Sequence, residues 1–158
     1  MKKVLIALNY DVSAQKVAEE GYSLAKILGA EITLLHVVTD PNYYTLVQHV
    51  TIMGFSGKTE NGGETPKDMP ELKELSLKFL NKSKLHLNDN SIQTLVKEGD
   101  CVKAILETAK EINAGLIIMG SHSSSEQKRK MPGSITKKIL TDAKCPVLII
   151  PRQENYNR

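Results

Sequence analysis

The sequence predicts an α/β fold, an open five-stranded parallel sheet with helices on both faces. Two observations predict it. Short apolar runs rich in branched residues alternate with segments whose apolar residues recur at helical spacing, five of the former and four of the latter. The connections from helices to the next strands are short, as in doubly wound sheets. Because each crossover returns over the sheet in the right-handed sense, strict alternation indicates parallel strands covered on both faces.

The first strand is expected over Lys3–Leu8 (KVLIAL), since a continuous apolar run suits a strand that is buried on both faces. A helix follows and ends at Gly29. Its apolar residues, which recur at helical spacing, are Val17, Ala18, Gly21, Leu24, Ala25 and Leu28. The second strand is predicted over Glu31–Val38 (EITLLHVV), only a couple of residues beyond the helix.

Residues 51–70 lack any apolar period and are rich in glycine, threonine, lysine and proline. Burial there cannot offset the entropy of ordering the chain, so a mobile loop insertion is expected, either a lid over a ligand site or a tolerated surface insertion. The next helix starts at Pro70 and Glu71, which suit a helix N-terminus, and runs to about Leu87.

The remaining elements follow in the same alternation. A strand is predicted over Ser91–Lys97, and Gly99-Asp100 supplies a turn and an N-cap for a helix that reaches Ile112. Gly115–Met119 (GLIIM) forms the fourth strand. The last helix runs from Gly133-Ser134 to about Ala143, and Pro146–Ile150 forms the final strand.

Composition restricts the classes of function. A chain of 158 residues with 41% hydrophobic content predicts one globular domain over residues 1–152, followed by a C-terminal tail at 153–158. A charge of only +3 and 4% aromatic residues argue against nucleic-acid binding. No apolar run approaches the ~20 residues of a membrane helix and no secretory signal begins the chain, so a cytoplasmic protein is expected, without a membrane partner. Cys101 and Cys145 have no CxxC spacing and are interpreted as small buried hydrophobes.

The segment from Met119 to Ile135 (MGSHSSSEQKRKMPGSI) carries the candidate site. Gly120 allows a sharp turn and a close approach of the backbone to a ligand, and the small residues after it leave amides free to bind an anion. Gly133-Ser134 adds the N-terminal amides of the last helix, where the dipole favours negative charge. These two donor clusters predict a phosphate site, although both are also ordinary turn and cap sequences.

The loop after the first strand is expected to face this segment. In open parallel sheets, ligands bind outside the carboxyl ends of the strands where the strand order reverses. If the first and fourth strands flank that point, Asn9 faces Gly120. No catalytic residue is predicted, since His122 has no second base or carboxylate in the loop to orient it. No metal site is predicted either, because His36, His49 and His86 lack ligand spacing.

Several motifs occur in a recognisable order: Met119-Gly120-Ser121-His122, then Gly133-Ser134-Ile135, then CPVLIIP at 145–151, with Val4–Leu8 and Leu34–Val37 in the first two strands. In this respect nearly the whole chain resembles the universal stress protein family. The resemblance implies a Rossmann-like sheet in strand order 3-2-1-4-5. It also implies a homodimer formed through the last strand, Val147–Ile150, whose apolar edge no later strand covers.

ATP-binding members of that family carry a glycine, two residues, a second glycine, nine residues, and then glycine with serine or threonine. This chain has Gly120 first, Ser123 in place of the second glycine, and Gly133-Ser134 last. Asn9 stands where binding members usually have an aspartate, which keeps an acceptor but removes a charge.

The resemblance implies an adenine-nucleotide site holding ATP or AMP, with or without Mg²⁺. Ala7 and Val37 would line the adenine slot beside Met119, and the later residues would present amides or hydroxyls to ribose and phosphates. The implied nucleotide-binding residues are Ala7, Leu8, Asn9, Val37, Met119, Gly120, Ser121, His122, Ser123, Gly133, Ser134 and Ile135.

The leading hypothesis is a nucleotide-binding regulatory protein of the stress response, not an enzyme, in which hydrolysis is absent or slow. The chain has no GxxxxGK[ST] motif, which excludes a P-loop ATPase. The alternative is a dimeric interaction scaffold of the same fold that does not bind nucleotide, which the departures at Asn9 and Ser123 permit. An adenylyl-transferring enzyme would need an SGGxDS-like loop after the first strand, and the residues from Asn9 to Ser13 do not supply one.

Overall fold

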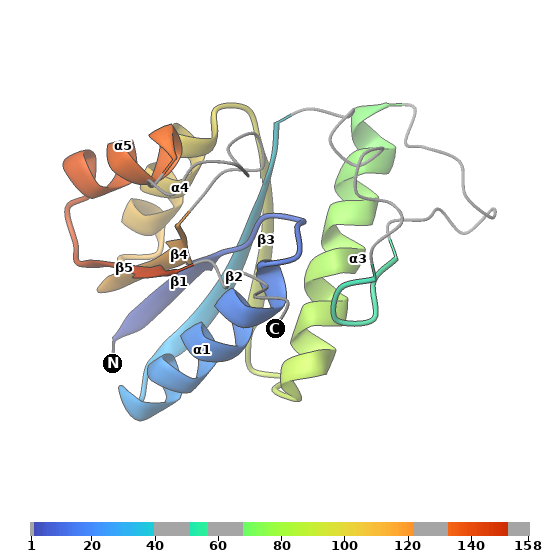
Figure 1. Ribbon diagram of the computed structural model, residues 1–158, viewed down its shortest axis with the longest axis horizontal. Coiled ribbons are helices and arrows are strands. Elements are labelled where there is room, and N and C mark those ends of the chain that lie inside the picture. The colour runs from blue at the N-terminus through green and yellow to red at the C-terminus, as the bar shows by residue number, and fades with distance from the viewer. Residues whose placement is uncertain (1, 40–50, 57–67, 122–132, 152–158) are drawn as a thin grey trace, which may run out of the picture.

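A computed structural model describes residues 2–39, 51–56, 68–121 and 133–151 (Figure 1). It contains a five-stranded sheet with the predicted strand order, β3-β2-β1-β4-β5, and every pair of neighbouring strands is parallel. The strands are β1 Lys3–Ala7, β2 Glu31–Val38, β3 Gln93–Glu98, β4 Leu116–Gly120 and β5 Val147–Ile150. The third strand starts later than predicted because Ser91 is held in a turn, in which its main-chain N–H donates to Asp89 Oδ1 at 2.9 Å.

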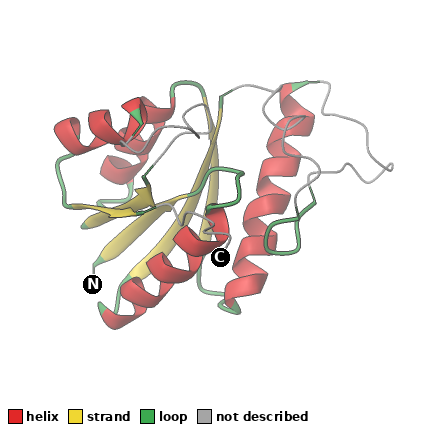
Figure 2. Ribbon diagram, viewed as in Figure 1, coloured by secondary structure: helices red, strands yellow, loops and turns green. Residues whose placement is uncertain are grey.

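Helices cover both faces of the sheet, as expected (Figures 1 and 2). Residues of α1 and α3 pack into the core on one face, and residues of α4 and α5 into the core on the other. The helices are α1 Ala14–Ile27, α3 Met69–Leu87, α4 Cys101–Glu111 and α5 Ser134–Asp142. None of the helices in the described part of the chain combines the length and apolar character that crossing a bilayer requires.

The central strands form the buried middle of the molecule. Leu5 and Ile6 on β1 have no exposed surface, and neither have Ile117 and Ile118 on the neighbouring strand β4. Burying such a side chain contributes about 1.5–3 kcal/mol, so the alternation of these residues between two cores secures both helix layers. The site that follows these two strands is therefore built on the most buried part of the sheet.

Helix ends follow the cap residues in the sequence. Asp100 caps α4 by accepting the main-chain N–H of Lys103 at 2.8 Å, as predicted. Gly29, with φ of +63°, and Gly99, with φ of +108°, occupy left-handed conformations that favour glycine. The cap of α3 is Asp68, which accepts the N–H of Glu71 at 3.0 Å and which the sequence analysis had placed in the loop.

The first residues of the expected loop insertion form a defined turn that packs into the core. Residues 51–56 form a tight turn in which Ile52 and Phe55 exchange two main-chain hydrogen bonds of 2.8 and 2.9 Å. Met53 and Gly54 take positive φ values of 50° and 80°, as a type I′ hairpin turn requires. Ile52 and Phe55 are 3% and 2% exposed, and Met53 between them is also buried. These three apolar residues reach the core although the segment has no periodic pattern. Residues 57–67 of the expected loop lie outside the described residues.

Candidate functional site

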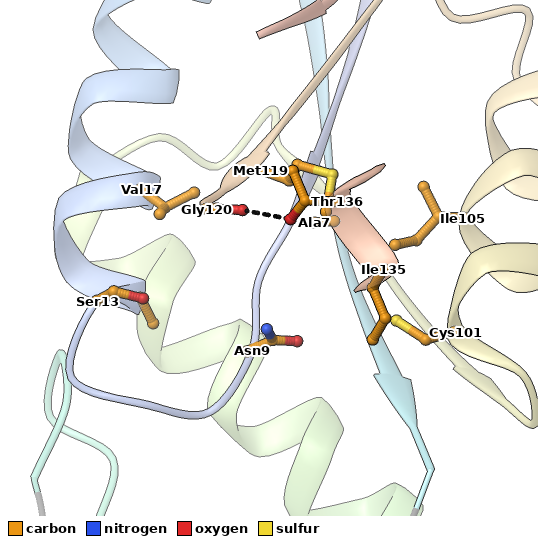
Figure 3. A pocket seen from close by; sticks show the side chains of 11 residues that line it. Ala7, Asn9, Ser13, Val17, Cys101, Ile105, Met119, Gly120, Ile135 and Thr136 are labelled. Carbon is orange, nitrogen blue, oxygen red and sulfur yellow. Dashed lines mark hydrogen bonds between the residues drawn. The ribbon is translucent and has the colours of Figure 1, made fainter. Parts of the chain in front are cut away.

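A cleft lies at the carboxyl ends of β1 and β4, the neighbouring strands between which the chain order reverses (Figure 3). This is the position where open parallel sheets bind ligands. The cleft contains about 440 Å³ of empty space including open solvent. The lining residues are Ala7, Asn9, Ser13, Ala14, Val17, Cys101, Ile105, Met119, Gly120, Ile135 and Thr136.

Gly120 allows close packing between β4 and α1. A Cβ atom at this position would lie 3.3 Å from Val17 Cγ2 and 3.8 Å from Ser13 Oγ. The first distance is tighter than about nine in ten contacts of a Cβ atom, so the Val17 side chain would have to shift by a few tenths of an ångström to admit a side chain here. The glycine expected to approach a ligand thus also serves the contact with α1.

Three hydrogen bonds hold the end of β4, two to the start of α5 and one to the end of β5. Ser121 donates its main-chain N–H to Ile150 O at 3.1 Å, and Gly133 donates its N–H to Ser121 O at 3.2 Å. The buried Thr136 donates its hydroxyl to Gly120 O at 3.3 Å. The main-chain N–H groups of Ser121 and Gly133 therefore already have acceptors within the protein, and the role of these two residues at a ligand stays a prediction.

The start of α5 carries main-chain N–H groups that have no main-chain acceptor in the described part of the chain. The N-cap Gly133 makes no side-chain cap hydrogen bond. The helical hydrogen-bond pattern begins at Lys137, whose N–H donates to Gly133 O. Among the described residues, no acceptor faces the N–H groups of Ser134 and Ile135. These amides and the helix dipole favour an anion at this end of the cleft.

The wall formed by α4 and the sheet is apolar. Ala7 and Met119 lie at its base, and Cys101 and Ile105 extend it from α4, as Figure 3 shows. Cys101 is half-buried, not fully buried as predicted, and so is Cys145. Burial, with a smaller contribution from the nearby charge of Asp100, raises the pKa of the Cys101 thiol to about 11. The thiol therefore stays protonated near neutral pH and acts as an apolar surface.

The wall formed by the loop after β1 is polar. The Asn9 side chain is exposed in the cleft, and its main-chain oxygen accepts the N–H of Asp11 at 3.0 Å. Asp11 is only 8% exposed, and its Oδ1 accepts both the N–H of Ser13, at 2.8 Å, and the Ser13 hydroxyl. The buried Asp11 Oδ2 has no hydrogen-bond partner among the described residues. This wall carries acceptors where the start of α5 carries donors.

An aromatic cluster supports the loop from behind. Tyr10 is completely buried, with ring centroids 5.0 Å from Phe55 and 5.2 Å from Phe79. Burial raises the pKa of Tyr10 to about 12. His36 lies 5.6 Å from Phe79, and its Nδ1 is 2.7 Å from Leu8 O, so this nitrogen donates to a carbonyl. Burial lowers the pKa of His36 to about 4, which keeps the ring neutral at ordinary pH.

The structure brings together Ala7, Asn9, Met119, Gly120 and Ile135 of the predicted set. Leu8 and Val37 are core residues that do not line the cleft, because their side chains point into the two cores. Ser134 opens α5 beside the cleft, and Ser121 and Gly133 close the loop. His122 and Ser123 lie outside the described residues.

Six lining residues were missed: Ser13, Ala14, Val17, Cys101, Ile105 and Thr136. Each lies at or within the first residues of a helix, so the carboxyl-end rule for parallel sheets was the signal that could have found them. Within the described residues, no group of three His, Cys, Asp or Glu side chains is arranged to hold a metal ion. The chemistry that the cleft offers is thus apolar contact, an anion site and an acceptor wall.

Comparisons with known proteins identify relatives over the full length. The model of the universal stress protein family matches residues 1–151. Universal stress protein A homolog 2 from Coxiella burnetii is 31% identical over 150 residues, which cover 94% of each chain.

Solved structures share the fold. The structure of MJ0577, a universal stress protein from Methanocaldococcus jannaschii, matches with a TM-score of 0.70 and 22% identity, covering 98% of both chains. A universal stress protein from Archaeoglobus fulgidus, solved in complex with dAMP, matches with a TM-score of 0.57 and 15% identity, covering 95% of this chain and 98% of that one.

Proposed function

Since this chain belongs to the universal stress protein family, we propose that it is a regulatory protein of the stress response that binds an adenine nucleotide, ATP or AMP, and acts as a homodimer. Hydrolysis is absent or slow in this proposal, because the described cleft brings no carboxylate and base together over a phosphate. The Archaeoglobus relative with bound dAMP supports the class of ligand.

The observation that carries the proposal is the pairing of an apolar wall with an anion site in one cleft. Met119, Ile105 and Cys101 offer contact to a base, and the amides of Ser134 and Ile135, which have no main-chain acceptor among the described residues, would receive phosphate oxygens. A nucleotide carries both kinds of group at opposite ends. Mg²⁺, where present, would be held by the phosphates, since the described residues provide no metal site of their own.

Calorimetry with ATP, ADP, AMP and GTP tests the proposal. We expect the wild type to bind ATP or AMP more tightly than GTP, and Gly133→Val to lose at least ten-fold in affinity, about 1.4 kcal/mol. Gly133 has φ of −65° and ψ of 165°, an extended conformation that valine also adopts, so the variant should fold. Its bulk would instead stand at the start of α5, where the phosphates are expected.

Gly115→Val is the matched control. Gly115 is exposed directly before β4, at the amino ends of the strands and thus at the end of the sheet opposite the cleft, and a Cβ there would meet Lys3 O at an ordinary 3.8 Å. This variant should bind as the wild type does. Wild-type affinity in Gly133→Val would place the phosphates elsewhere.

The second candidate function is a dimeric interaction scaffold without nucleotide. The internal use of the Ser121 and Gly133 amides favours it, because two of the expected phosphate donors are already occupied. The same calorimetry separates the two functions, since a scaffold would give no heat with any of the four nucleotides.

A further inference from the structure

The proton of the Ser13 hydroxyl is committed within the protein. Ser13 Oγ donates to Asp11 Oδ1, and a carboxylate can only accept. The same Oδ1 accepts the main-chain N–H of Ser13 at 2.8 Å, so the two residues fix each other's orientation. Ser13 also lines the cleft, where it can present only lone pairs to a ligand (Figure 3).

The surroundings of this hydroxyl strengthen its role as an acceptor. Asp11 is 8% exposed and its Oδ2 has no partner among the described residues, so a negative charge with an unsatisfied oxygen lies directly behind Ser13. The hydroxyl lies beside the end of β4, 3.8 Å from where a Cβ of Gly120 would be. A ligand anion at this wall would be repelled, whereas a hydrogen-bond donor would be attracted.

The two sides of the cleft therefore select opposite groups. The start of α5 offers to an anion the N–H groups of Ser134 and Ile135, for which the described part of the chain supplies no main-chain acceptor, and the start of α1 offers the Ser13 oxygen to a donor. In a nucleotide, the donors between the base and the phosphates are the hydroxyls of the ribose.

From this polarity we infer that Ser13 accepts a hydrogen bond from a ribose hydroxyl and so determines the preference of the site for ribonucleotides. Asp11 is the positioning residue of Ser13. Because the Ser13 hydroxyl already donates its proton to Asp11 Oδ1, it cannot donate to the ligand and can only accept. The inference rests on the proposed function, because it assigns a role within the same cleft.

The test is calorimetry with ATP, 2′-deoxy-ATP and 3′-deoxy-ATP in buffer containing EDTA, so that no bridging cation contributes. For the wild type, we expect one of the two deoxy analogues to bind about three- to ten-fold more weakly than ATP, the loss of one neutral hydrogen bond. For Ser13→Ala, the affinity for ATP should fall by a similar factor. The Kd of the deoxy analogue divided by the Kd of ATP should then fall to about one.

Ser23→Ala, at an exposed position of the same helix, is the matched control and should keep the wild-type ratio. The ratio is compared within one variant, so a partial loss of folded protein does not change it. An unchanged ratio in Ser13→Ala, or equal binding of all three ligands by the wild type, overturns the role of Ser13 and leaves nucleotide binding standing. No binding of ATP by the wild type overturns both this inference and the proposed function.

Discussion

His36 connects the floor of the cleft with the core through one buried hydrogen bond. Its Nδ1 donates to Leu8 O at 2.7 Å, directly before the exposed Asn9, and its ring packs against Phe79. The side chain is 3% exposed, so a charge on it would have almost no solvent to stabilise it. At the scale of single residues, the position of the loop after β1 thus depends on a histidine that stays neutral.

This gives a dependence of stability on pH. Burial lowers the pKa of His36 from 6.5 to about 4 in the folded protein, so between these values only the unfolded chain takes up the proton. The free energy of unfolding is therefore highest above about pH 6.5. It falls by on the order of 3 kcal/mol as the pH decreases towards 4. Urea unfolding between pH 7.5 and 4.5 measures it.

His36→Asn is the comparison, because the asparagine amide can still donate to Leu8 O and does not titrate. The wild type should lose stability more steeply than this variant as the pH falls. Parallel curves would mean that the buried histidine does not carry the effect.

The turn at residues 51–56 is the element that binds the long connection after β2 to the rest of the protein. Phe55 lies 5.0 Å from Tyr10 and 5.5 Å from Phe79, measured between ring centroids, so it bridges the loop after β1 and α3. Caps of the surrounding helices act locally, whereas this turn joins three segments that are distant in sequence.

Phe55→Ala should therefore destabilise the protein strongly. Removing a buried phenylalanine costs about 3 kcal/mol or more, through lost burial and the cavity left behind. The control is Leu85→Ala on α3, where the side chain is 65% exposed and the change should stay within about 0.5 kcal/mol. Equal, small effects of both substitutions in urea unfolding would show that the turn is not anchored as described.

The outer edge of β5 is the feature that bears on the assembly of the whole molecule. β5 is the last strand of the order β3-β2-β1-β4-β5, and in the described part of the chain no strand pairs with its outer side. Its Ile150 O also receives the Ser121 N–H at the base of the candidate site.

We expect Leu148→Lys to give a monomer on a calibrated sizing column, because a charge in the middle of an edge strand opposes pairing with another copy. Leu148 is half-buried and pairs in register with Ile118, so circular dichroism should accompany the measurement. Leu140→Lys, at a 50% exposed position on α5, should leave the dimer intact. A wild type that already runs as a monomer, or a dimer in the Leu148 variant, would contradict the assembly through β5.

The sequence by itself determined the strands, the order of the elements and the place of the cleft. Apolar runs such as Glu31–Val38 and caps such as Asp100 are local signals, since burial period and cap chemistry act over a few residues. The carboxyl-end rule then brought Asn9 and Gly120 to one cleft without further information.

Only the tertiary structure decided which acceptor each main-chain N–H group bonds to. That Ser121 donates to Ile150 and Gly133 to Ser121 depends on the three-dimensional neighbours of each amide, which no pattern in the sequence records. The same holds for the burial of Ile52 and Phe55 and for the committed proton of Ser13. Main-chain donors look alike in a sequence, and whether one is free for a ligand is settled by which acceptor the fold places within about 3 Å of it.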